Sequence, residues 1–230
     1  MFSEWGIGKY WGNYARLVRP GFFLEPDITQ EDEIPIGTTK IRGSPDVPGS
    51  FTWPDWSGTP ISFIAQINLS DFPMSYIDEH YPKEGVLHFF YVCDKGVTYS
   101  DEFLCGDTRE QNKVIFTTDL SNLVRFQAPL ATPSFSSSMV KIKFENTIPD
   151  AQYMSENNFF DSDEEAMELY HSFYSDYDSD IGFRFFGYID GLQYGSQEAD
   201  IEPLFQANSN QEISRNRDEM GFVWIALLLY

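Results

Sequence analysis

The strongest constraint on the fold is a run of alternating apolar residues. From Ile61 to Leu69 the apolar positions are 61, 63, 65, 67 and 69, which is the two-residue period of a β-strand. A second apolar run, Val86 to Val92, follows Gly85. Both runs predict β-strands, since each is short and is bounded by residues that favour turns.

Two further strands are predicted at Val114–Thr118 and Met139–Phe144. In the second of these, apolar residues alternate with residues suited to water: Val140, Ile142 and Phe144 share one face, and Met139, Lys141 and Lys143 share the other. This pattern is typical of an antiparallel sheet with one solvated face.

The segments around these strands add little regular structure. Lys9–Val18 predicts a short amphipathic helix ended by Arg19-Pro20, because proline cannot continue a helix. Thr38–Pro60 is crowded with Gly and Pro and predicts an irregular loop, which Trp53 and Trp56 would hold against a sheet face. We therefore expect an α+β fold with a long, mainly antiparallel sheet and a few flanking helices. The 230 residues are enough for a single domain, 1–230.

Charge is concentrated in one segment. Residues 144–183 contain eleven acidic residues and no Lys or Arg, which is more than half of the net charge of −21. Nucleic acid and anionic membranes are excluded as direct partners, because both require Lys and Arg to neutralise phosphate. A basic protein surface is the natural complement of such a segment.

Within this segment, Ser162 to Glu165 fits a capping box and predicts the start of a helix. Met167, Tyr170, Tyr174 and Tyr177 follow at helical spacing and form an apolar stripe. Packing of this stripe on the protein's own sheet is the favoured explanation, and contact with a partner is the alternative. The candidate partner-binding residues are Asp161, Asp163, Glu164, Glu165, Tyr170, Tyr174, Asp176, Tyr177, Asp178 and Asp180.

Enzymatic and metal chemistry have little support in the sequence, so we expect no enzyme and no cofactor. The three histidines are scattered, and the two cysteines, Cys93 and Cys105, lack the spacing of a zinc site or a redox pair. An EF-hand beginning at Asp176 would place Ile181 at the glycine position. The N-terminus has no signal-peptide pattern, which favours a cytoplasmic protein.

Three motifs carry a family resemblance: the G-x-P-D-x-P turn at Gly43–Pro48, the AQINL strand at Ala65–Leu69 and the EG-x-L-x-FF strand at Glu84–Phe90. Together they resemble the YwqG-like family of bacterial proteins of unknown function. The resemblance implies an α+β fold with a long antiparallel sheet and no assigned catalytic residues. Family members often lie near polymorphic-toxin genes, and some are similar to immunity proteins.

A weak internal duplication is expected over residues 38–125 and 181–230, joined by the acidic segment 144–183. Gly43-Ser-Pro-Asp46 precedes the strand SFIAQINL, and Gly187-Tyr-Ile-Asp190 precedes the strand VWIALLL. The resemblance implies a further strand after Val223–Leu229 that this sequence does not supply. A homodimer through that apolar strand is therefore a secondary expectation, because exposed strand edges invite pairing.

These features favour a non-enzymatic acidic protein, specifically a cytoplasmic immunity protein (antitoxin) that neutralises a basic bacterial toxin such as a nuclease. The alternative is a small-ligand-binding or housekeeping protein with a pocket near the Trp53/Trp56 loop, because aromatic-lined concave sites are common ligand pockets.

Overall fold

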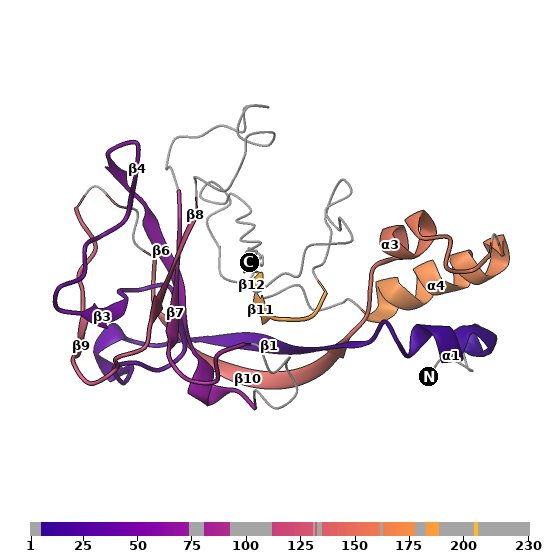
Figure 1. Ribbon diagram of the computed structural model, residues 1–230, viewed down its shortest axis with the longest axis horizontal. Helices are drawn as coiled ribbons and strands as arrows, with labels where there is room; N and C mark the ends of the chain where they lie inside the picture. The colour runs from indigo at the N-terminus through magenta and orange to yellow at the C-terminus, as the bar shows by residue number, and fades with distance from the viewer. Residues whose placement is uncertain are drawn as a thin grey trace. The chain divides into compact units, whose positions relative to one another are not determined.

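The computed structural model describes residues 6–73, 81–92, 112–130, 132, 135–161, 163–177, 183–188 and 205–206. The main sheet has eight strands in the order β12-β11-β1-β10-β2-β6-β7-β8 (Figure 1). Their bounds are β1 Arg19–Ile28, β2 Lys40–Ile41, β6 Ser62–Asn68, β7 Val86–Tyr91, β8 Asn112–Thr117, β10 Ser138–Thr147, β11 Phe183–Phe185 and β12 Phe205–Gln206. The pairings from β10 to β8 and from β1 to β12 are antiparallel. The predicted α+β fold, dominated by an antiparallel sheet, is confirmed.

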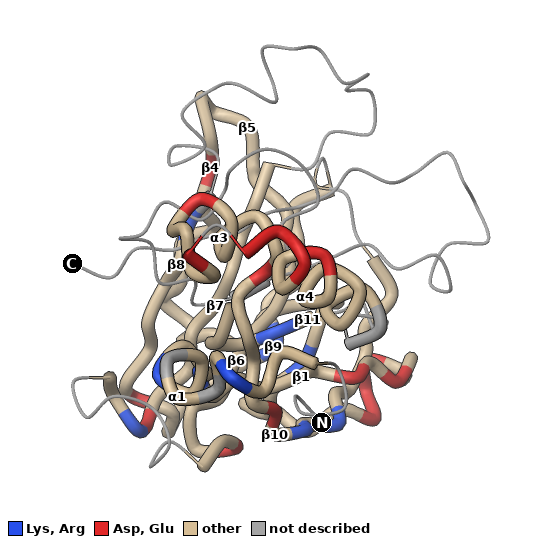
Figure 2. The backbone as a smooth tube through the Cα atoms, turned by 90° about the vertical axis from the view of Figure 1, so that its right-hand side faces the viewer, with Lys and Arg blue, Asp and Glu red and all other residues tan. Residues whose placement is uncertain are grey.

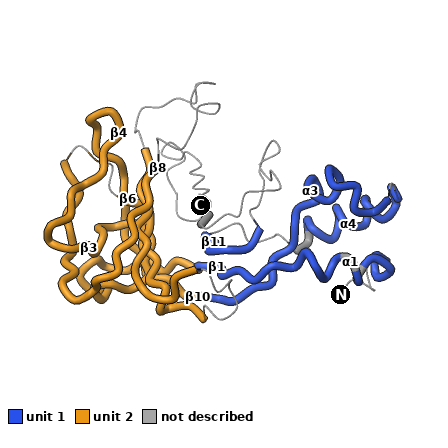
Figure 3. Tube along the Cα trace, in the orientation of Figure 1, with its two compact units in different colours: residues 1–24, 143–215, 224–230 blue, residues 25–142, 216–223 orange. Residues whose placement is uncertain are grey.

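The smaller elements form two ribbons and several helical turns. The ribbons pair β3 (Asp46–Pro48) with β9 (Leu123–Arg125) and β4 (Asp55–Trp56) with β5 (Thr59–Pro60). The helical elements are η1 Gly8–Tyr10, α1 Trp11–Tyr14, η2 Glu31–Glu33, η3 Leu69–Asp71, α3 Ala151–Glu156 and α4 Glu164–Tyr177. The chain divides into two compact units (Figure 3): unit 1 contains residues 1–24, 143–215 and 224–230, and unit 2 contains residues 25–142 and 216–223.

In unit 2, β6 and β7 are the central strands of the local sheet. The alternation predicted for residues 61–69 is confirmed as β6, but both faces of this strand are buried. A β-bulge between Phe63 and Ala65 interrupts the alternation, so Gln66 shares a face with Phe63 and lies opposite Ala65 and Ile67. Ser62 and Gln66 are polar and fully buried. His88 in β7 is buried in the same way. The face that carries Gln66 therefore requires hydrogen-bonding partners inside the protein.

Two predictions for the N-terminal half need correction. The expected helix at Lys9–Val18 is limited to η1 and α1, which end at Tyr14, and Pro20 lies inside strand β1. The region Thr38–Pro60, expected to be irregular, contains the short strands β2, β3, β4 and β5. Strands of two or three residues are too short to produce a periodic signal. The high Gly and Pro content of this region therefore led to the prediction of a loop.

The strand predicted at Met139–Phe144 is confirmed within β10, but its solvated face extends further than expected. Met139, Lys141 and Lys143 are exposed, whereas Phe144, placed on the apolar face, is 44% exposed. Its ring contacts Phe22 in an edge-on geometry, with the centroids 5.8 Å apart. This part of β10 therefore carries a partly solvated aromatic pair.

The predicted duplication is only partly within the described residues. On one side β11 pairs with β1, and on the other with β12 in the register Arg184↔Gln206 and Phe185↔Phe205. The prediction had assigned the corresponding strand to Val223–Leu229, which lies outside the described residues, as does the homodimer expected through it.

Candidate functional site

The acidic segment forms a small helical core in unit 1 with the N-terminal residues. In Figure 1, α4 lies between α1 and α3. Buried residues from all three parts pack together: Ile7, Tyr14, Ile148, Ala151, Met154, Phe160, Ala166, Tyr170 and Phe173. On α4 the buried positions are 166, 170 and 173, which recur at helical spacing and fix one face of the helix against this core.

Tyr170 is at the centre of that core. Its hydroxyl lies 2.5 Å from the Tyr14 hydroxyl and donates a hydrogen bond to the Pro149 carbonyl at 2.6 Å. Burial raises the pKa of Tyr170 above its usual value, so the phenol stays neutral. Because the side chain is fully buried, Tyr170 cannot be the partner contact that the sequence suggested. Packing on the protein's own core explains this residue.

Asp163 begins helix α4. Its carboxylate accepts a hydrogen bond from the Ala166 amide at 3.0 Å, which is the geometry of a helix N-cap. The cap is therefore Asp163 and not Ser162 as the capping-box pattern indicated, and Ser162 lies outside the described residues. Lys9 and the Tyr10 hydroxyl also donate to this carboxylate, at 2.6 and 2.8 Å. Hydrogen bonds from Lys9, Ala166 and Tyr10 lower the pKa of Asp163 to about 2.

The other predicted acids divide into exposed residues and residues that are not described. Asp161, Glu164 and Glu165 are exposed. Asp178 and Asp180 lie outside the described residues; Asp176 and Tyr177 end α4, but their side chains are not described. Tyr174 is partly buried against the helical core. The sequence prediction omitted two exposed acids of this region, Glu156 and Glu168, although the spacing of Glu168 at i+4 and i+3 from Glu164 and Glu165 is visible in the sequence.

On α3, on α4 and in the turn between them, the exposed Asp and Glu residues are accompanied by neutral polar residues and by no Lys or Arg. Five exposed carboxylates lie on α3, on α4 or between them: Glu156, Asp161, Glu164, Glu165 and Glu168. In Figure 2 the acidic positions of α3 and α4 face the viewer together. The sequence from 144 to 183 supplies no Lys or Arg to neutralise them. We call these five residues the acidic face.

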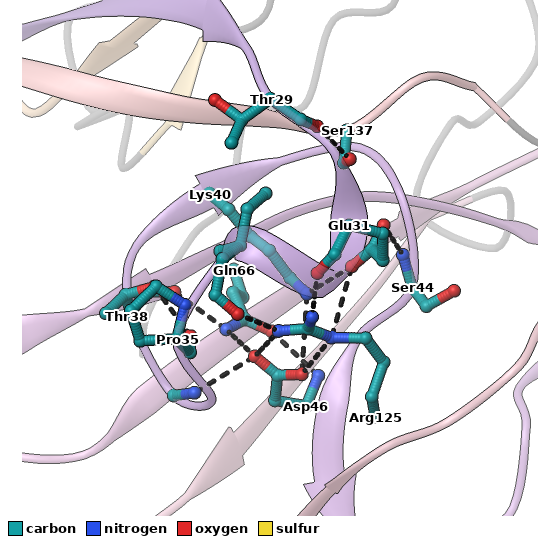
Figure 4. Close-up of polar contacts among 12 residues, drawn as sticks. Thr29, Glu31, Pro35, Thr38, Lys40, Ser44, Asp46, Gln66, Arg125 and Ser137 are labelled. Carbon is teal, nitrogen blue, oxygen red and sulfur yellow. Dashed lines mark hydrogen bonds and ion pairs between the residues drawn. The ribbon is translucent and has the colours of Figure 1, made fainter.

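A second cluster of charges lies in unit 2 and was not predicted (Figure 4). It centres on Asp46, the acid of the Gly43–Pro48 turn, which is fully buried. Its carboxylate accepts from Arg125 Nε, the Gly37 amide and Gln66 Nε2, each at 2.9 Å, and lies 3.4 Å from Lys40 Nζ. Burial alone would raise the pKa of Asp46, but the hydrogen bonds from Arg125 and Gly37 outweigh it and hold that pKa below its usual value.

Glu31 supplies the second carboxylate of this cluster. It accepts from Lys40 Nζ at 2.8 Å and from the Ser44 amide at 3.1 Å, and it lies 3.2 Å from Arg125 Nε. Burial lowers the pKa of the fully enclosed Lys40, and hydrogen bonding to Glu31 and the charge of Asp46 oppose that shift. The positive charges of Lys40 and Arg125 are therefore offset by the carboxylates of Asp46 and Glu31. Buried charges are tolerated when they are paired and hydrogen-bonded in this way.

Gln66 and His88 connect the cluster to the sheet. Gln66 accepts from the Asp46 amide at 2.8 Å and donates to the Thr38 carbonyl at 2.7 Å. The ring nitrogens of His88 lie 2.9 Å from the Asp46 carbonyl oxygen and 3.3 Å from that of Ile115. Burial lowers the pKa of His88, and the backbone carbonyls of Asp46 and Ile115 oppose that shift. Because its ring nitrogens are held by backbone oxygens inside the protein, His88 is interpreted as a structural histidine.

A family of proteins described as a domain of unknown function (DUF1963) matches residues 39–226 of this chain. The chain belongs to this family. No curated protein matches the chain in sequence. The DUF1963 region contains Lys40, Asp46, Gln66 and Arg125, and it also contains the acidic face.

The Trp53/Trp56 loop of this DUF1963 domain packs onto the sheet as predicted. Trp53 Nε1 donates to the Ile61 carbonyl at 2.8 Å, and its ring meets Phe90 of β7 at 5.4 Å between centroids. Phe51 stacks on the same Phe90 ring, and Phe126 contacts Phe51. Aromatic rings therefore surround Trp53, and this packing gives no support to the small-ligand pocket, which stays a prediction.

In the described parts of the chain, no group of three or more His, Cys, Asp or Glu side chains is placed to hold a metal ion. Among the same residues, no helix is both long and apolar enough to span a membrane.

Proposed function

We propose that this protein is a non-enzymatic binding protein whose acidic face docks on a basic protein surface. The supporting observation is that the apolar side of α4 packs on the helical core. This packing fixes the helix, so the positions that carry its exposed carboxylates face outward together. Glu164 and Glu168 are one helical turn apart, and Glu165 lies beside them. A rigid cluster of like charges would steer a basic partner toward this side.

The specific role we propose is that of a cytoplasmic immunity protein of the YwqG-like type, which neutralises a basic toxin such as a nuclease. Nucleic-acid-binding enzymes need a positively charged surface to hold phosphate. An acidic face would compete for that surface without any catalytic group of its own. Because the family has no assigned function, its membership neither supports nor opposes this role, and a direct test is needed.

The test uses the full chain as bait to capture basic proteins from its own host, followed by measurement of association rates with the captured protein. A triple variant, Glu164→Gln, Glu165→Gln and Glu168→Gln, should associate about tenfold more slowly at low salt, because charge steering changes association rates by 10-fold or more. The salt dependence of the association rate should also become shallower.

The matched control is Asp27→Asn, Asp32→Asn and Glu33→Gln, which removes three exposed acids from unit 2 with the same change in net charge. Equal association rates for the two triple variants would refute a role for the acidic face. Capture of no stoichiometric basic protein would refute the binding function itself. The immunity role further requires that the captured protein is a toxin whose activity is lost at a 1:1 ratio.

A further inference from the structure

The two carboxylates of the buried cluster in unit 2 reach it in different ways. Asp46 belongs to strand β3 and is fully buried, whereas Glu31 belongs to the helical turn η2 and its side chain is 28% exposed. Water can therefore reach the Glu31 carboxylate from outside. In Figure 4 this carboxylate points toward Lys40, Ser44 and Arg125, which come from other parts of the unit.

Three donors hold the two oxygens of the Glu31 carboxylate. Oε1 lies 2.8 Å from Lys40 Nζ and 3.2 Å from Arg125 Nε, and Oε2 accepts from the Ser44 amide at 3.1 Å. The turn leaves room for this group because residue 43 is a glycine with φ of +75°. A Cβ on Gly43 would collide with Oε2 and would lie 2.8 Å from the carboxyl carbon. The backbone and the cations are thus shaped around a carboxylate.

The two cations are held in place by other groups as well. Lys40 Nζ lies 3.4 Å from Asp46, and Arg125 Nε donates to the same carboxylate at 2.9 Å. Arg125 also donates to the backbone carbonyls of Glu31 and Ile34, so η2 stays attached to this guanidinium through its main chain. Removal of the Glu31 side chain alone would therefore leave both cations in position.

The charge balance specifies the kind of anion. Lys40 and Arg125 supply two positive charges, and Asp46 supplies one negative charge, so one further negative charge completes the balance. A single carboxylate meets this requirement. A phosphate dianion would place a second negative charge beside the fully buried Asp46, where the repulsion between like charges is little screened.

We propose that Lys40, Arg125 and the Ser44 amide form a carboxylate-binding site, which the side chain of Glu31 occupies and closes. When that side chain is shortened, the site accepts an external carboxylate from solvent. In the intact chain the attached Glu31 carboxylate is present at an effective concentration of about millimolar or above, so it excludes free carboxylates. This inference does not depend on the proposed binding function, because the acidic face belongs to unit 1.

Rescue of Glu31→Ala by acetate tests the site in the full chain. The substitution removes one carbon and the carboxyl group, and acetate has the same heavy atoms. Glu31→Ala should lower the thermal unfolding midpoint by about 4 °C or more, as expected for the loss of hydrogen bonds to charged groups in a chain of this length. Sodium acetate at about 0.2 M should recover at least about half of that loss, because a ligand that binds only the folded state stabilises it. Sodium chloride at the same ionic strength should not.

Two variants and the wild type serve as controls. Glu31→Gln keeps the site filled with a neutral side chain, so it should lose stability without responding to acetate. Asp32→Ala removes an exposed acid from the same turn. Together with the wild type, it measures the general effect of each salt on stability, which is subtracted.

The proposal is wrong if acetate raises the midpoint of Glu31→Ala no more than that of Glu31→Gln or of the wild type. Equal recovery with inorganic phosphate at about pH 7.5, where the dianion predominates, would refute the assignment of a single carboxylate. If Glu31→Ala is unfolded in chloride, circular dichroism replaces the midpoint as the readout. Folding restored by acetate then supports the site, and a chain that stays unfolded in acetate overturns it.

Discussion

Replacement of Asp46 by asparagine tests whether the buried cluster of unit 2 holds the fold together. The Asp46 carboxylate receives hydrogen bonds from Arg125, Gly37 and Gln66 and lies beside Lys40. All of these neighbours are donors. Asparagine offers one acceptor oxygen, so its own amide must face at least one of them. It also leaves the positive charges of the cluster without one of their two carboxylates.

The expected cost is about 3–5 kcal/mol, the usual penalty for removing one partner of a buried ion pair. A domain is typically stable by only about 5–15 kcal/mol, so the loss should be a large share of the total. Urea unfolding of the full chain measures it, with Asp55→Asn as the matched control. Asp55 accepts a single bond from the Gly58 amide in an exposed turn, so its replacement should cost about 1 kcal/mol or less.

The dependence on pH gives a second, independent readout. Because the folded protein lowers the pKa of Asp46, this carboxylate contributes stability above the pKa of the unfolded chain. That contribution disappears as the pH falls through the lower pKa of the folded state. The gap between wild type and Asp46→Asn should therefore be constant down to about pH 5 and shrink below about pH 4. A gap that is no larger than that of Asp55→Asn, or that does not change with pH, would refute the reasoning.

Two further substitutions test unit 1. Gly187→Ala should destabilise the protein by about 1–3 kcal/mol, because φ is +87° and a Cβ would lie 2.5 Å from Thr147 Oγ1. The control in the same unfolding assay is Gly49→Ala, where the added Cβ would have no atom within 4 Å. Tyr170→Phe should lower the free energy of unfolding by about 1–3 kcal/mol, because it leaves the buried Pro149 carbonyl without the Tyr170 hydroxyl as its donor. Equal stability of the Tyr170→Phe and Tyr174→Phe variants would contradict this account.

The elements that the sequence predicts correctly are those with local signals. The alternation in Ile61–Leu69 identifies β6, and the acids before Ala166 place the start of α4 within about one residue. Periodicity does not show what covers each face. The partners of the buried Gln66 and His88 include Asp46, which reaches them from another strand.

The buried cluster itself has no local signature, because its members are far apart in the sequence. Arg125 and Asp46 are separated by 79 residues, and Arg125 reaches back to carbonyl groups of Glu31 and Ile34. The one available signal is an acid between Pro45 and Pro48. The two prolines restrict the backbone around this acid, which begins the short strand β3.

Core packing of α4 and the proposed binding of a partner are compatible with each other. Burial of Ala166, Tyr170 and Phe173 accounts for the apolar residues of α4, and the same packing determines which residues remain outside. A helix fixed along one side cannot rotate its carboxylates away from one another. Repulsion among Glu164, Glu165 and Glu168 is therefore built into the folded state, although their position near the helix N-terminus offsets part of it. A basic surface would relieve the remainder, so binding should be favoured most at low salt, where this repulsion is least screened.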